Sequence, residues 1–95
     1  MAGKRIDANH SEIVAALRRV GAQVQSLASV GGGVPDLLVA FRGGWYVLEV
    51  KDGSKPPSKR RLTPAEAEWH MQFNDAAPVW IVNTVDEALE AIGAI

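Results

Sequence analysis

The chain of 95 residues contains no cysteine and only two histidines. Without cysteine the protein forms no disulfide, no thiolate nucleophile and no Cys-ligated zinc site. A metal ion would therefore have to be held by carboxylates, carbonyl groups or the histidines.

Long apolar runs are also missing. No stretch reaches the ~18 residues that a membrane span needs, and the N-terminal segment MAGKRIDANH lacks the apolar block of a signal peptide. The composition, 47% hydrophobic and 22% charged, is typical of a folded globular chain. We predict a single domain over residues 1–95, a cytoplasmic location and no membrane partner.

Basic residues are absent from the C-terminal third. All ten Lys and Arg lie in residues 1–61 beside five acids, whereas residues 62–95 contain six acids, so a formal net charge of −1 hides a basic N-terminal part. Basic side chains are densest at Lys51, Lys55, Lys59, Arg60 and Arg61. This cluster is either a solvated loop or a surface that contacts phosphate groups.

Capping signals predict three helices. Asn9 with Glu12 has the form of a capping box, and Thr63 with Glu66 repeats it, with Pro64 at the first helical position. The helices are expected from residue 9 to about 21, from 63 to about 74 and from 84 to about 93.

Segments rich in β-forming residues predict four strands, at residues 22–29, 36–41, 45–51 and 79–82. The second and third are separated by Arg-Gly-Gly and form a hairpin. The third and fourth flank a helix, as in a right-handed βαβ crossover, and should be parallel. The fold class is therefore α/β, a mixed sheet flanked by helices in the order α-β-β-β-α-β-α, with an irregular loop at 52–61.

The hairpin brings charged residues together. A two-residue turn at Gly43 and Gly44 places Asp36 opposite Lys51, and because side chains alternate between faces, Asp36, Glu49 and Lys51 share one face. The other face carries only apolar residues: Leu37, Val39, Phe41, Tyr46, Leu48 and Val50. A three-residue turn would instead move Asp36 to the apolar face.

Two carboxylates that face each other in a half-buried site repel unless a cation lies between them. Oxygen ligands of this kind favour Mg²⁺ or Mn²⁺, which bind through one or two carboxylates plus water and phosphate oxygens. Lys51 would then orient a water or neutralise charge on a phosphodiester. The alternative is a Glu49–Lys51 ion pair, with Asp36 as a turn residue.

These residues resemble a known family. Pro35-Asp36 followed by Glu49-Val50-Lys51 is similar to the PD-(D/E)XK nuclease motif. The wider pattern VGGGVPDLLV, VLEVK and LTPAEAEW resembles the VRR-NUC group over nearly the whole chain.

The resemblance implies a restriction-endonuclease-like fold and a Mg²⁺- or Mn²⁺-dependent deoxyribonuclease. Asp36, Glu49 and the carbonyl of Val50 would bind the metal, and Lys51 would be the catalytic lysine. Glu12 matches an acid that family members often carry on the first helix; its alternative role is the helix cap.

One departure from the family concerns Glu66, where Gln is usual. Glu66 either keeps its capping role or leans on the metal, and it cannot donate an amide hydrogen to a phosphate. His70, one turn later, could face the site, although packing or surface exposure is more usual for a helical histidine. Trp69 and Trp80 are expected in the core.

Stand-alone members of the group are similar to phage proteins that act as homodimers on branched DNA such as Holliday junctions. The resemblance thus implies a homodimer in the cytosol of a phage-infected or bacterial cell. Candidates for contact with the DNA backbone are Lys55, Lys59, Arg60, Arg61, Arg42, Arg18 and Arg19. A non-catalytic nucleic-acid-binding module and a small structural or partner-binding domain are the alternatives.

Overall fold

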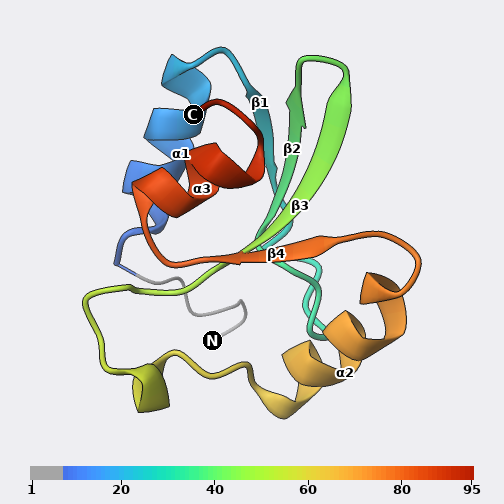
Figure 1. The fold of residues 1–95 in the computed structure, drawn as a ribbon. Helices are drawn as coiled ribbons and strands as arrows, with labels where there is room; N and C mark the ends of the chain where they lie inside the picture. Colours follow the sequence, from blue (N-terminus) through green and yellow to red (C-terminus); the bar gives the residue numbers. More distant parts are fainter. Residues whose placement is uncertain (1–7) are drawn as a thin grey trace.

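A four-stranded sheet organises the computed structural model, which describes residues 8–95 (Figure 1). The predicted order α-β-β-β-α-β-α is confirmed, with one short 3₁₀ turn in addition. The elements are α1 (His10–Arg19), β1 (Gln23–Ser26), β2 (Leu37–Phe41), β3 (Gly44–Val50), η1 (Pro57–Lys59), α2 (Pro64–Asn74), β4 (Val79–Val82) and α3 (Val85–Ala91).

The strands lie in the order β1-β2-β3-β4. β1 with β2 and β2 with β3 are antiparallel, whereas β3 and β4 are parallel, joined through α2. The predicted mixed sheet is therefore confirmed. β1 and β4 are its edges.

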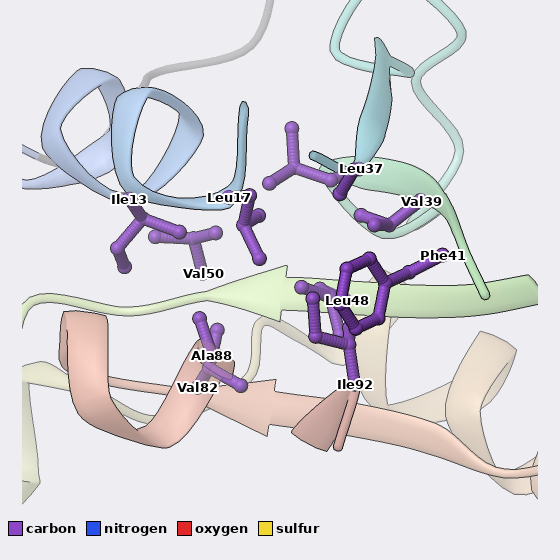
Figure 2. Close-up of a cluster of buried hydrophobic side chains, with 11 residues drawn as sticks. Ile13, Leu17, Leu37, Val39, Phe41, Leu48, Val50, Val82, Ala88 and Ile92 are labelled. Atoms are coloured by element: carbon purple, nitrogen blue, oxygen red, sulfur yellow. The ribbon is translucent and has the colours of Figure 1, made fainter. Parts of the chain in front are cut away.

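The core fills the space between the sheet and the pair α1 and α3, which lie side by side over one face (Figures 1 and 2). Alternate residues of β2 and β3 point into it, as the apolar pattern predicted. None of the helices within residues 8–95 is long and apolar enough to span a membrane. The buried apolar residues are Ile13, Leu17, Ala22, Leu37, Val39, Phe41, Leu48, Val50, Val82, Ala88 and Ile92.

The predicted hairpin register was wrong by two residues. Arg42 and Gly43 form the turn, both with positive φ (47° and 83°), and Phe41 pairs with Gly44. Positive φ at both central residues is typical of a type I′ hairpin, whose twist suits the flanking strands. A shift of two residues leaves every side chain on its predicted face, so the hydrophobic pattern does not distinguish the two registers.

All three helices start where the sequence predicted, since Asn9, Thr63 and Thr84 are the N-caps of α1, α2 and α3. Thr63 and Glu66 form the predicted capping box of α2, and the Thr84 hydroxyl accepts from the N–H of Glu87 at 3.1 Å. The capping box at Asn9 was wrong, because no side-chain cap hydrogen bond forms there. The loop 52–61, predicted to be irregular, contains η1, which tolerates Pro57 because its first residue needs no N–H partner.

Candidate active site

Asp36 lies immediately before β2, on the chain that enters the sheet from the glycine-rich segment. Its backbone N–H donates to Leu48 O at 3.1 Å, and its carboxylate Oδ2 accepts from the N–H of Val50 at 2.7 Å. The carboxylate thus meets the peptide link between Glu49 and Val50. The prediction that Asp36 faces Lys51 was wrong, since continuing the observed register by one pair sets Asp36 against Glu49.

Glu49 and Lys51 project from the end of β3, on the side of the sheet opposite the α1–α3 core. Lys51 Nζ lies 3.6 Å from Glu49 Oε2, so the ion pair considered from the sequence does form. Lys51 is 9% exposed and Glu49 only 1%, a degree of burial that charged groups tolerate only when they are paired.

Helix α2 closes this side of the site with two side chains one turn apart. Glu66 Oε1 accepts from Lys51 Nζ at 2.8 Å, and His70 Nε2 lies 3.8 Å from Glu49 Oε1. Glu66 and His70 are the two buried residues of α2. The helix therefore meets the strands through polar contacts, and His70 does face the site.

Glu66 serves two purposes at once. The same Oε1 that receives Lys51 also accepts from the N–H of Thr63 at 2.8 Å, as the capping box requires. The start of α2 and the position of the lysine are consequently fixed by one carboxylate. The capping role weighed from the sequence is confirmed, and the contact with Lys51 adds to it.

Asn9 holds the backbone of the site in place. Its side-chain amide donates to Lys51 O and Asn83 O, each at 2.9 Å, which ties the start of α1 to the ends of β3 and β4. No local pattern predicts this bridge, because the Asn9–Glu12 spacing indicated a cap instead.

The acidic residues fit a metal that keeps most of its water. Asp36 and Glu49 are buried carboxylates beside the backbone of Val50, which is the hard oxygen chemistry that Mg²⁺ and Mn²⁺ prefer. Residues 8–95 contain no group of three or more His, Cys, Asp or Glu side chains that could hold a metal ion. Glu12 is exposed in the first turn of α1 and does not join Asp36 and Glu49 in such a group. The metal-binding role of Glu12 stays a prediction.

Positive charge begins directly after the site. Lys55, Lys59 and Arg61 are exposed on the loop that follows β3, while Arg60 is half-buried and donates through Nε to Lys55 O at 2.7 Å. Arg42 is exposed at the far end of β3, its guanidinium 4.7 Å from the centre of the Phe41 ring. Arg18 and Arg19 are exposed in the last turn of α1. The predicted DNA-contacting residues thus lie at three places: the loop beside the site, the hairpin tip and the end of α1.

Asp52 anchors the start of the basic loop. Its Oδ1 accepts from the hydroxyl of Ser54 at 2.6 Å and from the N–H of Ser54 at 2.9 Å. These hydrogen bonds, helped by the charges of Lys55 and Arg60, lower the pKa of Asp52 below its ordinary value of 3.8. The ionised carboxylate of Asp52 is thus favoured, and it holds Ser54 at the start of the loop.

The two tryptophans expected in the core lie outside it. Trp80 is 40% exposed on the edge strand β4. Trp69 is half-buried and stacks on Phe73, with ring centres 4.0 Å apart. The most exposed tryptophan is Trp45, at 73%.

Comparison with known proteins finds no match for this chain, whether among protein-family models, curated proteins or solved structures.

Proposed function

We propose that the protein is a divalent-metal-dependent deoxyribonuclease that hydrolyses phosphodiester bonds. The observation that supports this most is the bond from Val50 N–H to the Asp36 carboxylate, which brings the acid to buried Glu49, two residues from Lys51. Two acids and a lysine gathered at the ends of two strands are a suitable set for phosphoryl chemistry.

In this proposal Asp36, Glu49 and the carbonyl of Val50 hold Mg²⁺ or Mn²⁺. The ion supplies an activated water and charge stabilisation for the phosphodiester. Lys51 places its ammonium group at the phosphate, where a compact point charge opposes the negative charge that develops. Glu66 holds Lys51 in position through the 2.8 Å hydrogen bond.

The exposed basic residues of the loop, Lys55, Lys59 and Arg61, contact the DNA backbone beside the cut, together with Arg60. Arg42 contacts it at the other end of β3. Contacts of this type carry little sequence information, so binding depends on salt and on the shape of the DNA. Branched DNA, such as a Holliday junction, is the proposed substrate.

A cytosolic homodimer is part of the same proposal. Large apolar side chains are exposed on the sheet and on α2, including Trp45 at 73%, Met71 at 75% and Ile81 at 46%. A chain of this size buries a limited fraction of its surface alone, and pairing would bury more. Two sites related by a dyad suit a two-fold symmetric junction.

A non-catalytic nucleic-acid-binding module is the second candidate. The observation in its favour is that Lys51 pairs with both Glu66 and Glu49. These carboxylates neutralise the lysine, so Lys51 has less positive charge to offer a phosphate. A module of this kind would bind DNA with no metal-dependent cleavage.

Incubation with a panel of labelled branched and linear DNAs distinguishes the two. Each DNA is tested with Mg²⁺, Mn²⁺ or EDTA, beside the Asp36→Ala variant. Cleavage by the wild-type protein that needs metal and is lost in Asp36→Ala supports the nuclease. Binding without cleavage under any metal supports the binding module. If the protein neither binds nor cleaves any of the DNAs, both candidate functions are excluded.

A further inference from the structure

A cleft of about 380 Å³ lies between the glycine-rich segment before β2 and the start of α2. Its volume falls within the range of small-molecule sites, about 300–1,000 Å³. Glu66, which holds Lys51, forms part of the wall, so the cleft opens beside the proposed reaction site. The lining residues are Ala28, Ser29, Gly31, Gly32, Gly33, Thr63 and Glu66.

Glycine gives the cleft its shape. Gly31, Gly32 and Gly33 all have positive φ (73°, 65° and 84°), so this wall is main chain without projecting side chains. A Cβ atom on Gly33 would overlap the carbonyl oxygen of Ala65 in the first turn of α2. The segment therefore approaches α2 backbone to backbone, and leaves a bare wall against which a flat ring can lie.

The chemistry of the lining disfavours a phosphate. The lining contains no Lys or Arg to balance a phosphate, and its one charged group, the Glu66 carboxylate, is already paired with Lys51. The hydroxyls of Ser29 and Thr63 and the peptide groups of the glycines are instead suited to the polar edge of a base or to a sugar. This lining therefore suits the uncharged part of a nucleotide better than its phosphate.

We propose that this cleft binds the base and sugar of a nucleotide that flanks the scissile phosphate. The inference rests on the proposed nuclease function and deepens it, because it assigns a nucleoside subsite to residues outside the set Asp36, Glu49 and Lys51. With the base held against the glycine wall, the adjoining phosphate is placed next to Lys51.

The test uses DNA substrates in which single nucleotides around the cut are replaced, one at a time, by an abasic residue. For the wild-type protein, loss of the base that occupies the cleft should lower kcat/KM about tenfold to a hundredfold, the usual effect of losing one stacked base. Abasic residues elsewhere should have little effect.

Two variants locate the effect. Ser29→Trp should fill the cleft, lower kcat/KM on intact DNA and abolish the loss of kcat/KM caused by the abasic residue. If Ser29→Trp does not fold, Ala28→Phe, which also fills the cleft, is used in its place. Val30→Trp is the matched control, because Val30 is 62% exposed and does not line the cleft, and it should retain both the rate and the penalty.

The inference is overturned if every abasic substrate is cut at the rate of intact DNA. It is also overturned if the cleft-filling variant keeps the abasic penalty. Failure of the wild-type protein to cut intact DNA is a separate result, which would refute the nuclease function and the subsite that depends on it.

Discussion

Glu66 is the residue whose substitution gives the most informative change in stability. Its Oε1 accepts from both Thr63 N–H and Lys51 Nζ, each at 2.8 Å. Glu66→Ala removes both contacts. Thr63→Ala removes only the hydroxyl that caps α2, and Glu66→Gln retains an oxygen acceptor for both donors but removes the negative charge.

The expected losses follow from these contacts. Loss of a helix cap lowers the free energy of unfolding by about 1 kcal/mol, and loss of a hydrogen bond to a charged group by about 1.5–3 kcal/mol. We therefore expect about 1 kcal/mol for Thr63→Ala and about 2.5–4 kcal/mol for Glu66→Ala. Glu66→Gln should lie near 1 kcal/mol, because Lys51 keeps an acceptor and its contact with Glu49.

Urea unfolding of the three variants measures these differences by linear extrapolation. A total of about 5–14 kcal/mol is expected for a domain of 95 residues, so each variant should remain folded. If Glu66→Ala loses no more than Thr63→Ala, the contact between Glu66 and Lys51 contributes nothing to stability, and the reasoning is refuted.

Three further substitutions test other parts of the structure. Gly33→Ala should lower the free energy of unfolding by about 2–5 kcal/mol, because position 33 has positive φ and the added Cβ atom would overlap Ala65. A loss below about 1 kcal/mol in urea unfolding contradicts the close contact between Gly33 and the backbone of Ala65. Arg42→Asn should change the free energy of unfolding by less than about 1 kcal/mol, because the gain from an Asn at positive φ is offset by loss of the guanidinium contact with Phe41. A decrease above about 1 kcal/mol contradicts the turn. Hydrogen bonds from Ser54 lower the pKa of Asp52, so they stabilise the folded state when Asp52 is ionised. This stabilisation is present above about pH 4 and is lost as the pH falls through the lowered pKa. Urea unfolding should thus separate wild type from Ser54→Ala more at about pH 6 than at about pH 2, and equal separation contradicts the assignment.

Local signals predicted most of the fold. The alternation of apolar residues in β2 and β3 identified the buried face, because burial on one face requires that pattern whatever the register. The capping box at Thr63 was correct because its two hydrogen bonds are local, and the contact of Glu66 with Lys51 leaves them intact. At Asn9 the same signal failed, because the amide donates to Lys51 O and Asn83 O, which are distant in sequence.

The sequence predicts which residues lie together in the candidate site, but not which of them contact each other. Asp36, Glu49 and Lys51 were identified as a group, yet a choice of turn between Arg42-Gly43 and Gly43-Gly44 decides which of them meet. The turn needs positive φ at two residues, which Arg42 and Gly43 supply. The glycine at position 44 instead leaves room for the Tyr46 ring, whose hydroxyl a Cβ atom there would meet at 3.0 Å. The contacts of Glu66 and His70 with β3 depend on how α2 docks, which no local pattern specifies.

In the proposed function, Asp36 and Glu49 support metal-dependent cleavage of DNA. The most direct measurement is the single-turnover rate of cleavage of a labelled branched DNA with Mn²⁺, for the wild-type protein and for Asp36→Asn. This variant keeps an oxygen that accepts from Val50 N–H but removes the charge a metal needs. We predict cleavage that EDTA abolishes and a rate at least about a hundredfold lower for Asp36→Asn, since even indirect metal partners contribute about tenfold to a hundredfold. Equal rates for the two proteins, or no cleavage by the wild-type protein, would contradict the claim.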